Sequence, residues 1–308
     1  MSLALVTPFR KDIEEWKEAI NALDPDIEVF IYPEIPHSKQ VLAALLWNHP
    51  ENIFTQFPHL RWVSSLGAGV DHIISDQHLP DDVVVTRIVD DELAIEMTRY
   101  LVMAVLSYQK NLFRYINAQA QKKWAPHPAR KNLKIGVLGL GFLGSHVAKA
   151  LSQLSFDVLG YAASEKKLKG VTTFHGEQQL PDFLTHLDVL INLLPLTPKT
   201  NGILGMNLFQ KFTRPVYLIN VARGAHVVEN DLLAALENRQ LSGAMLDVFD
   251  VEPLPDNHPF WTHPNITVTP HVASWTNPVA AVTQLVENYR RMRSGQKLLN
   301  EIQRNREY

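Results

Sequence analysis

Short apolar runs alternate with stretches of helical periodicity through the first part of the chain. One helical stretch places Ile13, Trp16 and Ile20 on a single face. The apolar runs are LALV (3–6), IEVFIY (27–32), VLAALLW (41–47), RWVSSL (61–66) and VVVTR (83–87). Because strands that alternate with helices are typical of a parallel sheet covered on both faces, this pattern predicts an α/β domain.

A long helix is predicted to leave this domain. Residues 91–123 contain neither proline nor glycine, and their apolar residues recur at helical spacing. The following WAPHPARKN (124–132) has two prolines and three basic residues, a composition typical of a connector.

A second and stronger α/β pattern follows the connector. Helical stretches occur at HVAKALSQL (146–154) and ENDLLAALENRQ (229–240), and a last helix is expected over 277–293, where it can return to cover the first domain. The apolar runs are LKIGVLGLG, SFDVLGY, DVLINLLP, RPVYLINVARG and ITVTPHVAS. We therefore expect two doubly wound parallel-sheet domains, the first of them discontinuous.

A glycine-rich turn connects the first strand and helix of this second series. Gly139, Gly141 and Gly144 have the spacing G-x-G-x-x-G, which permits a tight turn, close approach of a pyrophosphate and packing of helix on strand. The helix N-terminus offers free N–H groups to the phosphates. Glycine-rich turns also occur for packing alone, but the strand before and the helix after this one favour dinucleotide binding.

The end of the next strand bears on the choice of dinucleotide. NAD-preferring proteins carry an acid there, but this place falls at Ala162. Ser164 and Lys166 or Lys167 can instead bind a 2'-phosphate, so NADP(H) is favoured. NAD(H) remains an alternative cofactor, because Glu165, which lies a few residues beyond the strand end, can take the role of the acid. The lysines can equally belong to a solvated loop that binds no phosphate.

Composition narrows the function classes further. The formal net charge of -3 gives no overall basicity for nucleic acid or an anionic membrane surface. The absence of cysteine excludes disulfides and thiolate metal sites and favours the cytoplasm. The apolar runs, 101–106 among them, are far shorter than the roughly 20 residues that span a bilayer. The segment HPFWTHP (258–264) contains His258 and His263 together with two prolines and no acidic residue. We therefore expect a packed loop there and no metal site.

Four separated blocks resemble the D-isomer-specific 2-hydroxyacid dehydrogenases. They are the glycine turn, INVARGAHVVENDLLAAL (219–236), GAMLDVFDVEPLP (243–255) and ITVTPHVAS (266–274). Together with LLPLTPKT (193–200) and SLGAGVDHI (65–73), they look most like the glyoxylate/hydroxypyruvate reductase A group. The resemblance covers nearly the whole chain and implies an NAD(P)H-dependent reductase of small 2-oxoacids that forms a homodimer. It also implies a Rossmann cofactor domain (99–276) inserted into a flavodoxin-like substrate domain (1–98 and 277–308).

The same resemblance assigns catalytic and substrate-binding roles. Arg223 is expected to bind the substrate carboxylate and polarise the carbonyl. His271 matches the acid/base histidine, and Glu252 matches the glutamate that orients it and keeps it protonated for reduction. Ala68 and Gly69 belong to a loop whose backbone N–H groups receive the substrate carboxylate.

Cofactor contacts are implied at several further positions. Asp247 matches an aspartate near the nicotinamide, although capping of a loop is nearly as good an interpretation. The bulky Trp47 and Trp275 can narrow substrate choice or can belong to the core or an interface. The expected cofactor-binding residues are Gly139, Gly141, Phe142, Leu143, Gly144, Ser164, Lys166, Leu194, Pro195, Val221, Ala222, Arg223, Asp247 and His271.

Two alternatives compete with the reductase. A nicotinamide-sensing corepressor of the same fold can retain the catalytic trio, but the chain ends about 15 residues past the last helix, which argues against a long partner-binding tail. A dehydrogenase of a larger hydroxyacid such as phosphoglycerate usually has an acid at the Ala162 position.

Overall fold

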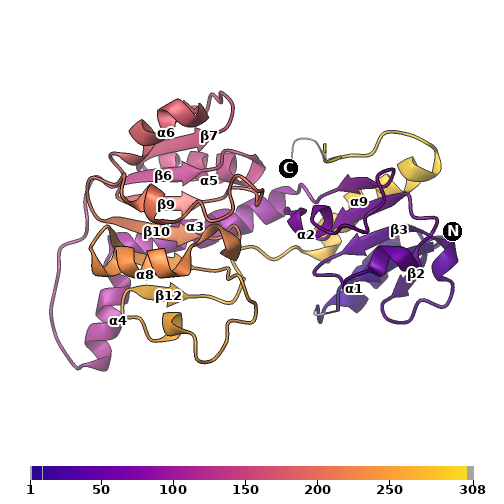
Figure 1. Ribbon diagram of the computed structural model, residues 1–308, viewed down its shortest axis with the longest axis horizontal. Helices are drawn as coiled ribbons and strands as arrows, with labels where there is room; N and C mark the ends of the chain where they lie inside the picture. The colour runs from indigo at the N-terminus through magenta and orange to yellow at the C-terminus, as the bar shows by residue number, and fades with distance from the viewer. Residues whose placement is uncertain (1, 9, 304–308) are drawn as a thin grey trace. The chain divides into compact units, whose positions relative to one another are not determined.

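The computed structural model describes residues 2–8 and 10–303, and the chain forms two compact units (Figure 1). The first unit holds Met1–Leu93 and Thr276–Tyr308, and the second holds Ala94–Trp275. The first segment of the first unit ends at Leu93, five residues before the expected boundary at 98. The second unit ends at Trp275, one residue before the expected boundary at 276.

The first unit is built on a five-stranded parallel sheet of order β2-β1-β3-β4-β5. Each predicted apolar run forms a strand, since the sheet is buried on both faces and apolar side chains are required on each. The strands are β1 (Ser2–Val6), β2 (Glu28–Ile31), β3 (Val41–Leu46), β4 (Trp62–Ser65) and β5 (Val84–Thr86).

Helices cover both faces of this sheet. α1 (Ile13–Leu23) buries Trp16 and Ile20 against one face, together with α9 (Pro278–Arg293). The opposite face packs against η2 (Ile53–Gln56) and α2 (Asp71–Ile74), with η1 (Ser38–Gln40) preceding β3. The last helix, α9, is therefore part of the first unit, in agreement with the helix expected over 277–293 that can return to cover the first domain.

The second unit has a seven-stranded parallel sheet of order β12-β11-β10-β9-β6-β7-β8. Its chain order reverses at β6, which lies between β9 and β7, so the sheet is doubly wound as expected. The strands are β6 (Lys134–Leu138), β7 (Asp157–Ala162), β8 (Thr172–His175), β9 (Val189–Asn192), β10 (Val216–Asn220), β11 (Leu241–Leu246) and β12 (Ile266–Val268).

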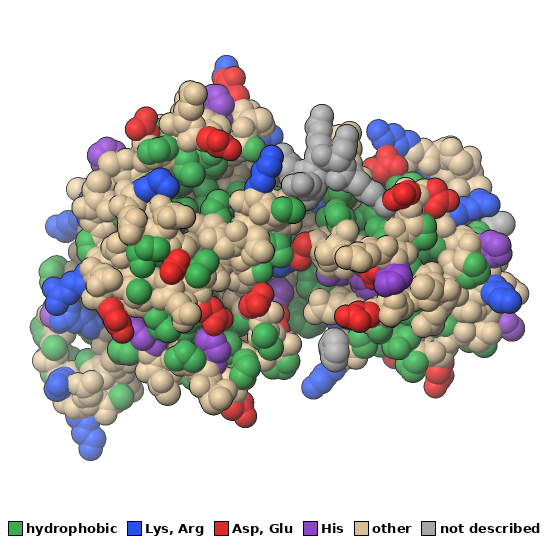
Figure 2. Space-filling view, in the orientation of Figure 1, with side chains coloured by type: hydrophobic (Ala, Val, Ile, Leu, Met, Phe, Trp, Pro, Cys, Tyr) green, Lys and Arg blue, Asp and Glu red, His purple; other side chains and the backbone are tan. Residues whose placement is uncertain are grey.

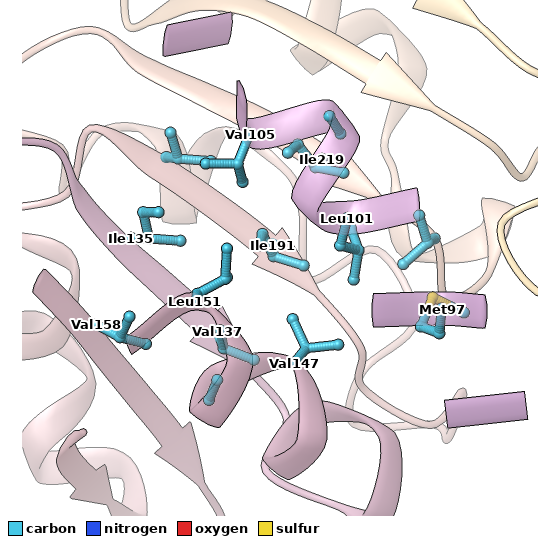
Figure 3. Close-up of a cluster of buried hydrophobic side chains, with 14 of the residues drawn as sticks. Met97, Leu101, Val105, Ile135, Val137, Val147, Leu151, Val158, Ile191 and Ile219 are labelled. Atoms are coloured by element: carbon cyan, nitrogen blue, oxygen red, sulfur yellow. The ribbon is translucent and has the colours of Figure 1, made fainter. Parts of the chain in front are cut away.

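Two hydrophobic clusters fix the helices of the second unit on its sheet. α3 (Asp91–Gln109) and α5 (Phe142–Gln153) pack on one face, where Leu101, Val147 and Ile191 meet in a cluster shielded from solvent (Figure 3). The other face packs against α6 (Gly176–Leu184), α7 (Met206–Phe209) and α8 (Glu229–Glu237). Two short helices, η3 (Gly224–His226) and η4 (Pro259–Trp261), lie in loops that follow β10 and β11.

The single long helix expected over 91–123 is wrong. The helix stops at Gln109, and a second helix, α4 (Leu112–Ala120), begins after Asn111, which has the left-handed φ of 61°. Asn111 donates from Nδ2 to the Pro128 carbonyl at 2.9 Å and accepts a short hydrogen bond from Arg130. The connector thus binds at the break, a long-range contact that helical periodicity does not reveal.

Within the described ranges, no helix is both long and apolar enough to cross a membrane.

Candidate active site

Three neighbouring strands of the second unit deliver polar side chains to one edge of the sheet. Arg223, Asp247 and His271 each follow the carboxyl end of a strand, namely β10, β11 and β12. These strands are adjacent and parallel, so the loops after them lie side by side. Carboxyl ends of parallel strands are where α/β sheets place ligands, which makes this edge the candidate site.

A histidine and a carboxylate pair at this edge. His271 Nδ1 lies 2.7 Å from Glu252 Oε2, and the side chains are 34% and 30% exposed. The other carboxylate oxygen, Oε1, accepts from the Phe249 amide at 2.9 Å. Since Nδ1 is engaged by Glu252, Nε2 is the ring nitrogen that can exchange a proton with a substrate.

The charges around Glu252 favour its ionised form. Burial raises the pKa of Glu252, but the hydrogen bond and charge of His271, the Phe249 amide and the charge of Arg223 outweigh it. The pKa of Glu252 therefore lies below its ordinary value of 4.5, and the group is a carboxylate at neutral pH.

The backbone of His271 is held by Asp247. His271 has a left-handed φ of 55°, which is uncommon outside glycine, and its N–H donates to the Asp247 carbonyl at 2.8 Å. The Asp247 carboxylate accepts from the amides of Val272 and Ala273 at 3.0 and 2.8 Å. One aspartate thus fixes both sides of the catalytic candidate in a backbone conformation that requires support.

A hydroxyl relay completes this support. The Thr269 hydroxyl donates to the Asp247 carboxylate at 2.6 Å, and the Tyr100 hydroxyl from α3 lies 2.6 Å from the same threonine oxygen. Asp247 is fully buried, and burial raises its pKa in spite of these bonds. The loop-capping interpretation of Asp247 is what the structure shows, while its contact with a nicotinamide stays a prediction.

Replacing Asp247 with asparagine is expected to loosen the His271 loop. The amide N–H₂ of asparagine would face one of the two backbone N–H groups, so a buried hydrogen bond is lost and the unfolding free energy falls by about 2 kcal/mol. Urea unfolding measures this change, and Asp182→Asn on the exposed face of α6 is the matched control. An unchanged urea midpoint in Asp247→Asn would contradict the positioning role.

Arg223 projects from the segment directly after β10. Its Nη1 donates to the Ala222 carbonyl at 2.7 Å, and its charge is one of the influences that lower the pKa of Glu252. The structure therefore brings Arg223, Glu252 and His271 into one electrostatic unit, as expected from the sequence resemblance.

A buried amide network braces the same edge. Asn192 Nδ2, at the end of β9, donates to Asn220 Oδ1 at 3.0 Å and lies 2.9 Å from His226 Nδ1. Asn220 in turn accepts from the Ala222 amide and donates to the Arg223 carbonyl, at 3.2 and 2.9 Å. This network was not predicted from the sequence, although the asparagine that ends both VLIN and VYLIN was a signal for it.

The same network reaches the predicted cofactor-binding segment after β9. The Leu194 amide donates to Asn192 Oδ1 at 3.2 Å, and His226 Nε2 lies 3.3 Å from the Pro195 carbonyl. Leu194, Pro195, Val221 and Ala222, four of the expected cofactor-binding residues, thus lie in two segments tied together by three buried polar side chains.

The glycine turn fits a dinucleotide. Gly139 has φ +105°, and a Cβ there would lie 2.7 Å from the Leu193 carbonyl oxygen, while a Cβ on Gly144 would lie 1.8 Å from the Gly139 oxygen. A Cβ on Gly141, by contrast, would meet nothing within 4 Å. Among the described residues no side chain caps the N-terminus of α5, so the amides of Phe142 and Leu143 and the open space before them suit a pyrophosphate.

The segment that follows β7 bears on the adenosine ribose. β7 ends at Ala162 as expected, and no carboxylate occupies the strand end. Glu165, the competing acid, is 64% exposed and lies 3.6 Å from Lys167. Ser164 and Lys166 are both exposed on this segment.

The loop predicted to bind the substrate carboxylate lies in the first unit, at the carboxyl edge of its own sheet. Ala68 and Gly69 are half-buried between β4 and α2. Gly67 has a packing reason to be glycine, because a Cβ there would lie 2.6 Å from the ring of Trp47. Trp47 also packs edge-on against His72, with ring centroids 5.1 Å apart, so this tryptophan is part of the support of the loop.

Comparisons with known proteins identify the family of the chain. The model of the D-isomer specific 2-hydroxyacid dehydrogenase NAD binding domain matches residues 102–273. The chain belongs to this dehydrogenase family. A glyoxylate/hydroxypyruvate reductase A from Photorhabdus laumondii is 40% identical over 304 residues, 96% of each chain. Another, from Serratia proteamaculans, is 40% identical over 303 residues, again 96% of each chain.

Solved structures of this dehydrogenase family share the whole fold. A D-isomer specific 2-hydroxyacid dehydrogenase from Xanthobacter autotrophicus, in complex with NADPH and MES, has a TM-score of 0.93 and 37% identity and covers 100% of this chain and 99% of its own. An NADPH-dependent glyoxylate/hydroxypyruvate reductase from Sinorhizobium meliloti, in complex with NADP and sulfate, has a TM-score of 0.92 and 32% identity, with coverage of 100% and 99%.

The predicted family, fold class and enzyme class are therefore confirmed, and this 2-hydroxyacid dehydrogenase is an NAD(P)-dependent oxidoreductase. His258 has a structural place in it, since its Nε2 lies 3.1 Å from Glu229 and its Nδ1 accepts from the Phe260 amide. Trp275 is 54% exposed at the end of the second unit.

Proposed function

We propose that this dehydrogenase reduces glyoxylate and hydroxypyruvate with NADPH. The observation that carries the proposal is the His271–Glu252 pair beside Arg223, on the same sheet edge as the glycine turn. A proton donor, a fixed cation and a dinucleotide cradle are what carbonyl reduction requires. Relatives named glyoxylate/hydroxypyruvate reductase A, 40% identical over nearly the whole chain, support the substrate class.

Each site residue has a distinct task in this proposal. The guanidinium of Arg223 and the amides of Ala68 and Gly69 bind the substrate carboxylate. His271 Nε2 then donates a proton to the carbonyl oxygen as it becomes an alkoxide, and the Glu252 carboxylate stabilises the imidazolium that precedes this step. A bound nicotinamide supplies the hydride that reaches C2. The hydride and the proton together convert the oxo group into a hydroxyl group.

The preference for NADPH rests on the segment after β7. The strand ends in Ala162 where an acid would repel a 2'-phosphate, and Glu165 is engaged by Lys167 at 3.6 Å. Ser164 and Lys166 supply a hydroxyl donor and a positive charge. The related structures from X. autotrophicus and S. meliloti contain NADPH and NADP.

Parallel kinetics with both cofactors test the proposal. Purified protein is assayed with NADPH and with NADH against glyoxylate, hydroxypyruvate and pyruvate, following the loss of reduced cofactor. We expect kcat/KM to be highest with NADPH and with the first two acids. Tight binding of NADPH without turnover of any acid would overturn the proposal in favour of a cofactor-sensing protein.

Lys166 offers a sharper test of cofactor choice. Lys166→Ala removes a positive charge from the proposed 2'-phosphate site, and we expect KM for NADPH to rise about tenfold, the effect of one charge-assisted contact, while KM for NADH changes little. Lys169→Ala, also exposed and three residues away, is the matched control. Equal rises for NADPH and NADH would place Lys166 outside that site.

The charge of Glu252 is expected to influence how the rate of reduction depends on pH. Because the pKa of Glu252 lies below its ordinary value of 4.5, this carboxylate is charged throughout the neutral range, 2.7 Å from the His271 ring. Glu252→Gln removes that charge at every pH, so we expect the basic limb of the kcat/KM profile to move to lower pH by about one unit. Glu237→Gln, exposed at the end of α8, is the control. An unmoved basic limb would show that Glu252 does not act through the imidazole charge.

We also propose that the enzyme is a homodimer. α4 exposes Leu112 and Ile116, α3 exposes Met103, and Trp124 in the connector is 98% exposed. Figure 2 shows hydrophobic and basic side chains mixed on the projection that carries α4. Exposed apolar surface of this kind suits a second copy of the chain, and light scattering should give the mass of two chains.

A further inference from the structure

The carboxyl edge of the five-stranded sheet carries a cation that the proposed reaction does not use. β4 has β3 and β5 as neighbours, so the loop with Ala68 and Gly69 is flanked by the residues that follow those strands. Trp47 follows β3, and Arg87 directly follows β5. The Ile88 amide donates to the Gly67 carbonyl at 3.1 Å, which joins the Arg87 segment to the substrate loop.

The backbone of Arg87 is fixed from both sides. Its carbonyl accepts from Gln284 Nε2 at 2.7 Å, and the oxygen of the same amide accepts from the Val89 N–H at 3.2 Å. The Arg87 N–H donates to the Asn300 carbonyl at 3.4 Å. A side-chain amide from α9 and the segment that follows this helix therefore hold the base of the side chain in place.

The guanidinium of Arg87 has no counter-ion in the part of the chain that the structure describes. Arg87 is half-buried, and burial alone lowers its pKa, with no carboxylate opposing the shift. Through residues 2–8 and 10–303 no acid, carbonyl or aromatic ring pairs with its side chain. Asp90 caps the first turn of α3 by accepting from the Glu92 amide at 3.0 Å, and Glu92 accepts from Asn277 at 3.1 Å, so both acids have other partners.

A half-buried guanidinium without a partner is costly in free energy, and the hydrogen bonds on both sides of the Arg87 backbone keep the base of this side chain at the edge of the sheet. Structural arginines of this burial are normally paired with a carboxylate. The missing anion is therefore expected from a ligand, and the ligand expected at this edge is the oxoacid.

We propose that Arg87 binds a second anionic group, a carboxylate or a phosphate, on the 2-oxoacid substrate. The inference rests on the proposed function and deepens it. In the proposed reaction the first carboxylate is already bound by other residues, and glyoxylate has no other charge. The planar fork of Arg87 suits carboxylate and phosphate oxygens. The enzyme accordingly accepts dianionic 2-oxoacids, and Arg87 discriminates them from monoanionic ones.

Substrate-selective kinetics test this role. Wild type, Arg87→Gln, Arg87→Lys and the exposed control Arg61→Gln are assayed with glyoxylate, hydroxypyruvate, oxaloacetate and 3-phosphohydroxypyruvate. We expect wild type to reduce at least one of the two dianionic acids, and which one distinguishes carboxylate from phosphate. Arg87→Gln should lower kcat/KM for that acid by about 30-fold, the effect of losing a charge-assisted pair, and change glyoxylate less than threefold. Arg87→Lys should recover part of the activity on that acid, because an ammonium keeps the charge but lacks the planar fork.

A binding measurement separates this inference from the reaction itself. Calorimetric titration of the NADP⁺ complex with malonate and acetate compares unreactive dianionic and monoanionic acids. We expect Arg87→Gln to weaken malonate about tenfold and to leave acetate unchanged. Two kinetic results with Arg87→Gln would overturn the role of Arg87: an equal loss of kcat/KM on glyoxylate and on the dianionic acid, or no loss on either. Unchanged malonate binding in Arg87→Gln would overturn it as well. If wild type reduces no 2-oxoacid, the proposed function fails, and malonate binding alone decides on Arg87.

Discussion

His271→Ala is expected to lower kcat for glyoxylate reduction by about 10³-fold while the affinity for NADPH stays unchanged. The imidazole is the group whose Nδ1 is held by Glu252 at 2.7 Å, so its removal deletes the proton donor together with the function of the carboxylate. Stopped-flow measurement of the hydride step measures this loss, and fluorescence titration of NADPH measures cofactor binding.

Two comparisons make the His271 prediction specific. His59→Ala replaces an exposed histidine of the first unit and should behave as wild type. Adding Glu252→Gln to His271→Ala should cause little further loss, because the glutamate acts through the histidine and their effects are not additive. A His271→Ala enzyme with full activity would remove the assignment of this residue as the proton donor.

Arg223→Ala is expected to lower kcat/KM for glyoxylate by about 10³-fold, with KM raised and kcat lowered together. The guanidinium binds the carboxylate in the ground state and opposes the charge that develops on the carbonyl oxygen, so both constants depend on it. Arg223→Lys should recover only part of the loss, because an ammonium lacks the planar fork. Steady-state kinetics at saturating NADPH give both constants.

The Arg223 prediction has its own control. Arg61→Ala removes an exposed arginine of the first unit and should leave both constants unchanged. Because the charge of Arg223 helps lower the pKa of Glu252, Arg223→Ala should also raise that pKa and shift the acidic limb of the kcat profile to higher pH. A loss confined to KM would show that Arg223 binds substrate without stabilising the transition state.

Much of the fold followed from the alternation of apolar runs and helical periods. Each apolar run that was expected to form a strand does so, and the glycine turn lies between β6 and α5 as expected. β8 was missed because VTTFH is an edge strand with few fully buried side chains, so its apolar signal is weak. The helix break at Asn111 was missed because a contact with the connector causes it.

The candidate site divides in the same way. The identities of Arg223, Glu252 and His271 were available from motif resemblance, and their place after strand ends followed from the apolar runs. Their supports were not available. Asp247 holds the His271 loop through Thr269 and two amides, and the side chains of Asn192, Asn220 and His226 brace the neighbouring segments through contacts between separate strands and loops.

The sequence by itself determined the two α/β patterns, the dinucleotide turn and the reacting side chains, because periodicity and short motifs are properties of neighbouring residues. Only the tertiary structure decided that Asp247 caps the His271 loop, that Trp47 packs on Gly67 and that Arg87, at the end of β5, has no counter-ion among the described residues. Each of these depends on which distant segments the sheets bring together, and burial and charge pairing exist only once those segments have met.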